Sequence, residues 1–287
     1  MQTVLSIQSF VSHGCAGNSA AVFPLQRLGV TVLPVHTVLF SNHTGHPTWR
    51  GPLVPAADVS EIITGIDERG ALTTTDAVLS GYLGSAEVGE VVLDAVNRTR
   101  RRNPEAVFLA DPVMGDRDTG LYCRDEIPEF FREHVVPAAD IMTPNLFELE
   151  QLTGGSLHGL DDVVAAAEEL RRRGPAVVLV TSVVLDDAPD GLLRMLAVDE
   201  EGTWVVETPV LQRRFVGTGD LTAALFLAHW LTGGDTAEAL GATASAVYSV
   251  LERTDVMGEE ELQLVAAQEQ LVTPVNLFTP RALPRTC

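Results

Sequence analysis

The chain has 287 residues, 46% of them hydrophobic, and carries a formal charge of −20 with a sequence pI near 4.6. Such an acidic composition argues against nucleic acid or an anionic membrane as the main partner. All 19 basic residues are arginine. The lack of lysine excludes P-loop NTPases, protein kinases and enzymes that hold pyridoxal phosphate as a Schiff base, because each class needs a lysine in its site.

Length and hydrophobic content favour one large α/β domain over residues 1–287 rather than two small ones. Cys15, Cys123 and Cys287 are too few and too scattered for a disulfide framework or a zinc site, which fits a reducing compartment. The first ten residues lack the pattern of a signal peptide, and no run reaches the roughly 18 apolar residues of a membrane span. We therefore expect a cytoplasmic protein with no membrane partner.

Strand-like apolar runs alternate with helix-period segments along almost the whole chain. In chain order we predict a strand at 4–7, a helix at 18–28 capped by Asn18 or Ser19, strands at 30–38 and 76–79, a helix at 85–100, strands at 107–110 and 140–142, a helix at 161–173, a strand at 176–180, a hairpin of 192–198 with 204–207, and helices at 220–231, 236–251 and 259–271. The tail from Pro274 is expected to pack loosely. The alternation predicts a mostly parallel sheet with helices on both faces and an antiparallel edge.

The tetrapeptide Gly217-Thr218-Gly219-Asp220 follows an extended stretch and opens a long apolar helix. Its glycines let the backbone turn so that several N–H groups point at one spot, where the helix N-terminus adds its positive dipole end. A carboxylate on the first turn can reach a hydroxyl beside the bound anion. Such a cradle with a base suits phosphoryl transfer from a nucleotide to an alcohol, although an ordinary capped glycine turn has the same sequence pattern.

Polar clusters follow six of the predicted strands, at the edge where ligands of parallel sheets bind. Asp111 and Asp116 share a glycine-containing loop and can hold a hard cation, and Asn145 and Glu148 face the same way on a first helical turn. The polar segment 117–124 is predicted to be a lid. Each cluster alone also fits a capped turn or a solvated loop, but together with the cradle they favour a nucleotide site. The remaining clusters are Ser9 with Gly14 and Gly17, residues 41–45, residues 80–85, and Thr181-Ser182.

Eight motifs spread over nearly the whole chain carry a resemblance to a known family. They are Ser6-Ile7-Gln8-Ser9, Ala16-Gly17-Asn18-Ser19-Ala20-Ala21, Phe40-Ser41-Asn42-His43-Thr44, Ser80-Gly81-Tyr82-Leu83-Gly84-Ser85, Asp111-Pro112-Val113-Met114-Gly115, Thr143-Pro144-Asn145-Leu146 through Glu148, Gly217-Thr218-Gly219-Asp220, and Leu262 to Gln268. On these residues the chain resembles the bacterial pyridoxal kinases of the ribokinase-like superfamily. The resemblance implies the ribokinase-like fold, ATP and Mg²⁺, and a homodimer. It also implies phosphorylation of the 5′-hydroxymethyl group of pyridoxal.

The resemblance also implies a role for each matching residue. Asp220 would be the base, and the amides of Gly217, Thr218 and Gly219 would stabilise the transferred phosphoryl group. The other implied residues are Ser9, His43, Thr44 and Tyr82 for the substrate; Asp111, Thr143, Asn145, Glu148, Thr181, Ser182, Thr208, Pro209, Val210 and Leu211 for the nucleotide; and Asp111, Asp116 and Glu148 for Mg²⁺, directly or through water.

Three residues depart from the family pattern. Thr181 stands where many bacterial members have lysine, Phe10 replaces a usual histidine, and His46 stands where an aromatic residue is common. Two alternatives remain open: a kinase of the same fold that acts on hydroxymethylpyrimidine or another small alcohol, and a noncatalytic vitamer-binding protein. The noncatalytic alternative is disfavoured because a pure binder would not need Asp220 and the acidic loops.

Overall fold

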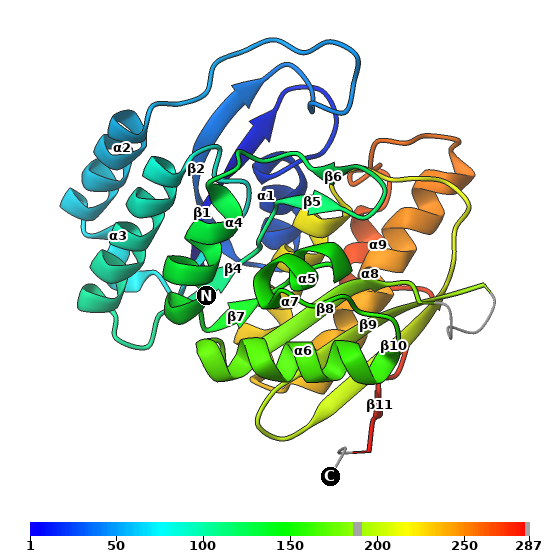
Figure 1. Cartoon of the computed structure of the whole chain (residues 1–287). Coiled ribbons are helices and arrows are strands. Elements are labelled where there is room, and N and C mark those ends of the chain that lie inside the picture. The colour runs from blue at the N-terminus through cyan, green and yellow to red at the C-terminus, as the bar shows by residue number, and fades with distance from the viewer. Residues whose placement is uncertain (186–190, 285–287) are drawn as a thin grey trace.

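The computed structural model describes residues 1–185 and 191–284. In that part of the chain a nine-stranded sheet runs through the molecule in the order β11-β10-β9-β8-β7-β4-β3-β1-β2 (Figure 1). The strands are β1 (Thr3–Val11), β2 (Thr31–Phe40), β3 (Ala77–Ser80), β4 (Val107–Ala110), β7 (Ile141–Met142), β8 (Val177–Val183), β9 (Leu192–Val198), β10 (Thr203–Pro209) and β11 (Arg281–Ala282), and a separate hairpin pairs β5 (Gly115–Asp116) with β6 (Gly120–Leu121).

Strands β2, β1, β3, β4, β7 and β8 are parallel, and β8 to β11 are antiparallel. This confirms the predicted mostly parallel sheet with an antiparallel edge. The central strands are apolar and buried over most of their length, as expected for a sheet covered on both faces. Because β8 and β10 both pair antiparallel with β9, they run in the same direction, and their carboxyl ends share one edge with the ends of the parallel strands.

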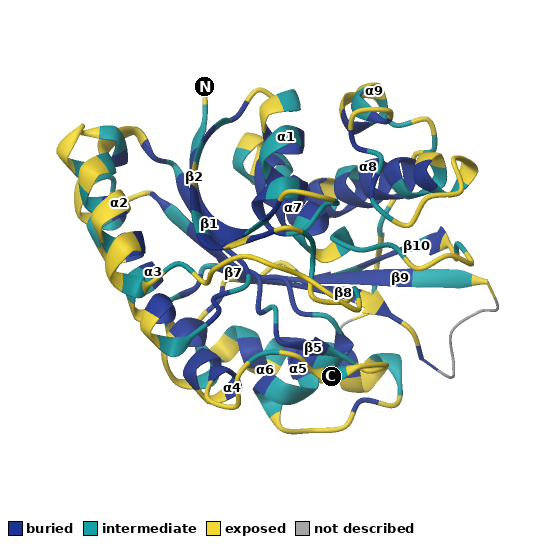
Figure 2. Cartoon of the chain, turned by 90° about the horizontal axis from the view of Figure 1, so that it is seen from above, coloured by how far each residue is buried: buried dark blue, intermediate teal, exposed yellow. Residues whose placement is uncertain are grey.

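Helices cover both faces of the sheet (Figures 1 and 2), as the sequence predicts. One apolar cluster joins the sheet to α2 (Ala56–Glu68), α3 (Ala86–Arg102), α4 (Ile127–Phe130), α5 (Leu146–Thr153) and α6 (Leu160–Arg173). The other joins it to α1 (Asn18–Arg27), α7 (Thr218–Gly233), α8 (Thr236–Val256) and α9 (Gln268–Val272). Short helical turns occupy Ala71–Thr74, Phe131–Val135 and Val136–Ala138.

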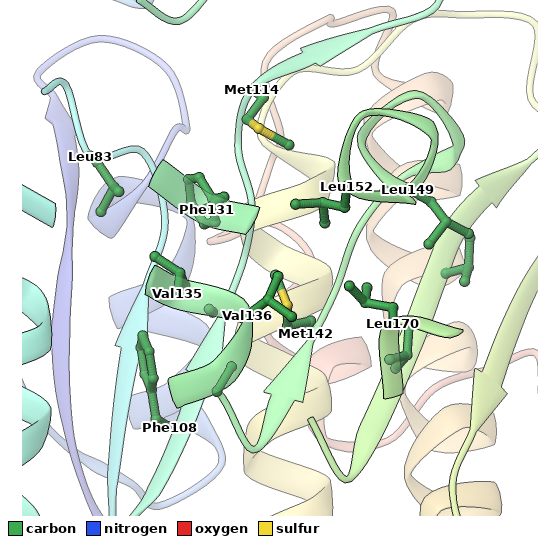
Figure 3. Packing of buried hydrophobic residues seen from close by; sticks show 14 of the residues in the cluster. Leu83, Phe108, Met114, Phe131, Val135, Val136, Met142, Leu149, Leu152 and Leu170 are labelled. Carbon is green, nitrogen blue, oxygen red and sulfur yellow. The ribbon is translucent and has the colours of Figure 1, made fainter. Parts of the chain in front are cut away.

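The core beneath α5 fixes the position of the loops that follow β4 and β7. Met114, Met142, Leu149 and Leu152 belong to this buried cluster, together with Leu170 of α6 (Figure 3). Met114 has no exposed surface, so the acidic loop after β4 is anchored in the core at its midpoint. Loss of so large a buried side chain leaves a cavity and costs several kcal/mol in typical proteins, about 2–5 for Met to Ala.

Three local predictions are wrong. Gly17, not Asn18 or Ser19, is the N-cap of α1, because Asn18 is buried and its amide donates to Val35 O (3.0 Å) while its Oδ1 accepts from Ser6 Oγ (2.7 Å). The predicted helix 259–271 reduces to α9, since the preceding residues pair with another segment through the bridge between Val216 and Glu261.

The tail from Pro274 is the third correction, because it packs more closely than predicted. Phe278 meets Tyr248 edge to face with ring centroids 5.1 Å apart, and its amide donates to Ser245 Oγ (2.9 Å). Strand β11 then pairs with β10. Cys15 and Cys123 are free thiols, and Cys287 lies outside the described residues. Among the described residues, none of the helices combines the length and apolarity that crossing a bilayer requires.

Candidate active site

Two glycine loops, one after β1 and one before α7, pack against each other at the carboxyl edge of the sheet. Gly217 is the N-cap of α7 with φ +81°, and a Cβ there would lie 1.9 Å from the carbonyl oxygen of Cys15. Gly17 has φ +56°, and a Cβ there would lie 2.3 Å from Ser9 Oγ. Only glycine fits at either position. The close approach therefore brings Ser9, which the sequence assigns to the substrate, next to the loop that carries Asp220.

Asp220 lies in the first turn of α7 and is half-buried. Burial raises the pKa of its carboxyl group to about 6, while hydrogen bonding from the amides of Gly17 and of Asp220 itself opposes the rise. Most of the carboxyl groups are therefore ionised at neutral pH, yet they are more basic than those of a surface aspartate. The adjacent Gly219 is exposed, so the helix N-terminus opens toward solvent and can receive an anion.

Two buried carboxylates lie behind this loop, at the ends of β4 and β7. Thr143 Oγ1 donates to Asp111 Oδ1 (2.7 Å). Glu148 Oε1 accepts from the amide of Met114 (3.0 Å), and its Oε2 accepts from the amide of Asn145 (2.9 Å). Asp111 and Glu148 are each only 4% exposed, so their charges have little access to water. The structure thus brings together the two acidic motifs that the sequence places 37 residues apart in the chain, from Asp111 to Glu148.

The electrostatics of these groups show that four carboxylates converge on one region. Burial, and then the charge of Asp220, raise the pKa of Asp111; burial and the charge of Asp111 raise that of Glu148. The pKa of Tyr122 is raised by desolvation and then by Glu148, Asp220, Asp111 and Asp116. A concentration of like charges in a weakly solvated space is unfavourable without a cation. The donor set is therefore chemically suited to a hard divalent ion, which prefers oxygen ligands.

The β5–β6 hairpin lies at the start of the segment 117–124 that the sequence predicts to be a lid, and α5 holds its first strand. Asn145 caps α5 by accepting from the amide of Glu148 (2.9 Å), and its side-chain nitrogen donates to Gly115 O (2.9 Å). A Cβ at Gly115 would lie 2.5 Å from the ring of Phe147, so the hairpin lies directly on the first turn of α5. The capping alternative is confirmed, and the capping box also positions the acidic loop, while the site role of Asn145 and Glu148 stays a prediction.

The residues assigned to the nucleotide lie along the same edge. The amide of Thr181 donates to Pro144 O (2.9 Å), which sets the end of β8 beside the start of α5. Ser182 has φ +53° and is, within the described residues, the one non-glycine residue with positive φ. Thr208 is buried, and residues 209 and 210 are exposed at the end of β10. Backbone strain at an exposed strand end is typical of ligand-binding sites.

The residues assigned to the substrate lie in β1 and in the loops that follow β2 and β3. Ser9 is buried, Thr44 is exposed, and Tyr82 is half-buried with its pKa raised by desolvation and then by Cys123. Phe10, one of the departures from the family pattern, packs on the ring of His36 with centroids 4.7 Å apart. The assignment of these residues to the substrate stays a prediction.

Sequence analysis missed two residues near this site. Glu261 accepts from His43 and contacts His46, but it sits in an acidic run that looks like solvated surface. Tyr122 directly follows β6, and the nearby carboxylates contribute to its raised pKa after desolvation. No short-range signal identifies Glu261, because its histidine partners are more than 200 residues away. An aromatic residue in a polar lid could have identified Tyr122.

Comparison with known proteins identifies the family of the chain. The family model described as phosphomethylpyrimidine kinase matches residues 12–264. A pyridoxal kinase PdxY from Rubrobacter xylanophilus is 55% identical over 279 residues, which is 97% of this chain and 96% of the relative. One from Corynebacterium diphtheriae is 48% identical, covering 94% and 96%. The chain belongs to the pyridoxal kinase family.

Solved structures of pyridoxal kinases share its fold. The Leishmania donovani enzyme in complex with ADP and ginkgotoxin superposes with a TM-score of 0.91 at 31% identity, over 99% of this chain and 100% of the other. Its complex with ADP and pyridoxamine superposes equally well, at 30% identity and the same coverage. The ribokinase-like fold implied by the sequence motifs is thereby confirmed.

Proposed function

We propose that this protein is an ATP-dependent pyridoxal kinase, which converts pyridoxal and ATP into pyridoxal 5′-phosphate and ADP. The observation that carries the proposal is the half-buried Asp220, whose pKa is raised to about 6. It follows the glycine turn Gly217 to Gly219 and lies near Asp111, Asp116 and Glu148, which together are called the acidic centre. Membership of the pyridoxal kinase family supports the substrate. The continuous nine-stranded sheet of the described residues supports one kinase domain over residues 1–287.

In the proposed reaction, Asp220 accepts the proton of the 5′-hydroxymethyl group as its oxygen attacks the γ-phosphorus of ATP. The bond between that phosphorus and the β–γ bridging oxygen breaks, and ADP leaves with the electron pair. The amides of Gly217, Thr218 and Gly219 stabilise the negative charge on the transferred group. This arrangement needs no cationic side chain in the cradle, which suits a chain without lysine.

The remaining site residues divide by position. Ser9, His43, Thr44 and Tyr82 would contact the pyridine ring and its substituents. Along the edge formed by β7, β8 and β10, the nucleotide would lie against Thr143, Asn145, Thr181, Ser182 and the strip Thr208, Pro209, Val210 and Leu211. The support is their common location at strand ends around Asp220.

Mg²⁺ fits the acidic centre, because its donors are oxygen atoms with unfavourable uncompensated charge. Asp111 and Asp116 would hold the ion. Both oxygens of Glu148 already accept backbone amides, so Glu148 would act through water. When bound, Mg²⁺ would neutralise charge on the phosphates of ATP.

Replacing Asp220 by Ala tests the proposal. We expect kcat to fall by about 10²–10⁴, the usual contribution of a general base, while ATP binding measured by calorimetry changes little. Asp161→Ala, an exposed acid on α6, is the control and should keep full turnover. Undiminished turnover in Asp220→Ala would reject the assigned base.

The name of the matching family model favours one second candidate, a hydroxymethylpyrimidine kinase. Coupled assays of ADP formation with pyridoxal, pyridoxine, pyridoxamine and hydroxymethylpyrimidine separate the two. Vitamer binding without ADP formation at any Mg²⁺ concentration would instead support a noncatalytic binding protein.

Family resemblance is also the support for a homodimer, which sedimentation would test. A cytoplasmic location is proposed from the low cysteine content.

A further inference from the structure

Two histidines and a glutamate, none of which belongs to the acidic centre, contact one another. His43 and His46 lie on the segment after β2, and Glu261 lies between α8 and α9. Nε2 of His43 is 3.0 Å from Glu261 Oε1, and Nε2 of His46 is 3.3 Å from the same oxygen. The side chains of His43 and Glu261 are 17% and 18% exposed, so this contact is largely shielded from water. His46 is 39% exposed and leaves one side of the cluster open.

We propose that His43 Nε2, His46 Nε2 and the Glu261 carboxylate bind one zinc-class divalent ion. In a tetrahedral zinc site with bonds of about 2.0–2.2 Å, neighbouring ligand atoms are separated by about 3.3–3.5 Å. The two separations from Glu261 Oε1, 3.0 and 3.3 Å, are close to this spacing, and one ligand atom from each of the three residues lies within 4.8 Å of the others. Two imidazoles and a carboxylate with one open position form a common zinc ligand set.

Contacts outside the three ligands hold the carboxylate in place. The amide of Cys15 donates to Glu261 Oε2 (3.0 Å), which leaves Oε1 facing the two rings. A Cβ at Gly14 would lie 2.2 Å from Oε2, so the loop after β1 packs directly on the carboxylate. Outer contacts of this kind orient metal ligands and strengthen binding. The site would thereby tie together three segments that are distant in the sequence.

Imidazole ligands distinguish this site from the proposed Mg²⁺ site, whose donors are oxygen atoms. His43 Nδ1 accepts from the amide of Gly45 (3.2 Å), which assigns the proton of a neutral ring to Nε2, facing Glu261. Metal binding requires Nε2 to lose this proton to solvent and Nδ1 to gain one. Gly45 is exposed, so its amide can turn to water when this happens.

Cobalt(II) titration tests the site independently of catalysis. The full chain is stripped of metal with EDTA and titrated in excess Mg²⁺, which occupies oxygen-ligand sites. We expect one Co²⁺ per chain with the intense visible absorption of a four-coordinate ion, and its loss when Zn²⁺ is added. His46→Gln and Glu261→Gln should each weaken binding at least about 100-fold, because loss of outer contacts alone costs 10–100-fold.

His158→Gln is the matched control, since His158 is an exposed histidine near the start of α6. It should bind Co²⁺ as the unmodified chain does. Circular dichroism of the metal-free variants shows whether each is folded, and a Zn²⁺-dependent rise in the melting temperature of the unmodified chain gives a second measure of binding.

Three results would overturn the proposal: no saturable Co²⁺ binding in the unmodified chain, unchanged affinity in His46→Gln and Glu261→Gln, or a sulfur-to-cobalt charge-transfer band, which would make Cys15 a ligand. The proposal does not depend on the kinase function, because each readout is made without substrate.

Discussion

The raised pKa of Asp220 predicts the pH dependence of turnover. A general base must be ionised, so activity should fall as pH decreases through the pKa of about 6. With that value, the ionised fraction is about 0.9 at pH 7 and about 0.1 at pH 5. With the ordinary value of 3.8, it would stay above about 0.9 at both. The structure therefore predicts a fall of about 10-fold in kcat/KM between pH 7 and pH 5, where an ordinary aspartate would give almost none.

The assay must separate Asp220 from the titration of ATP and pyridoxal. The pH dependence of the residual kcat/KM of Asp220→Ala reports the ionisations of ATP and pyridoxal, but not that of the base, which this variant lacks. The ratio of unmodified to variant kcat/KM, measured from pH 5 to pH 8, therefore isolates Asp220 in the free enzyme. A ratio that is constant over this range would refute either the base or the burial that raises its pKa.

Three further predictions concern stability. Asp111 has a raised pKa in the folded state, so its ionisation lowers the free energy of unfolding as pH rises from about 4 toward 8. Asp111→Asn removes this charge and should raise the melting temperature by about 2–4 °C at pH 8, and by less at pH 5. Calorimetry without ATP, pyridoxal or metal would show the difference. Gly217→Ala should destabilise by at least about 1–3 kcal/mol, because its Cβ would overlap the Cys15 carbonyl, whereas Gly219→Ala has open space and should change urea unfolding little. Ser182→Gly should stabilise by about 0.4–1 kcal/mol by relieving positive φ, while the KM for ATP rises if its hydroxyl contacts phosphate.

Sequence patterns predicted the sheet and most helices because apolar periodicity is a local property. They failed where a distant segment competes for the backbone. Asn18 is a residue type that often caps helices, but its side chain is buried and hydrogen-bonds with Ser6 Oγ and Val35 O instead. The stretch 259–271 has helical periodicity, yet its first half pairs with the residue preceding Gly217. Local propensity is a weak determinant once tertiary contacts are available.

The sequence predicted which loops lie together at the candidate site, but it did not predict the contacts between their side chains. Strand ends in a parallel sheet meet at one edge, so the motifs around Asp111 and Asp220 had to be neighbours. The pKa of Asp111 depends on its burial and on the distance to Asp220, which no spacing in the sequence encodes. Glu261 contacts His43 through Oε1 while the loop after β1 packs on Oε2 and fixes the carboxylate, and no spacing in the sequence encodes this arrangement.

The acidic centre links folding to ligand binding. Asp111 and Glu148 are buried with raised pKa values, so the ligand-free protein holds them in an unfavourable state near neutral pH. Their hydrogen bonds from Thr143 and from backbone amides offset only part of that cost. A divalent cation would remove the remainder, and by linkage its binding would stabilise the fold. The same carboxylates would therefore supply affinity for the Mg²⁺ that the proposed reaction needs.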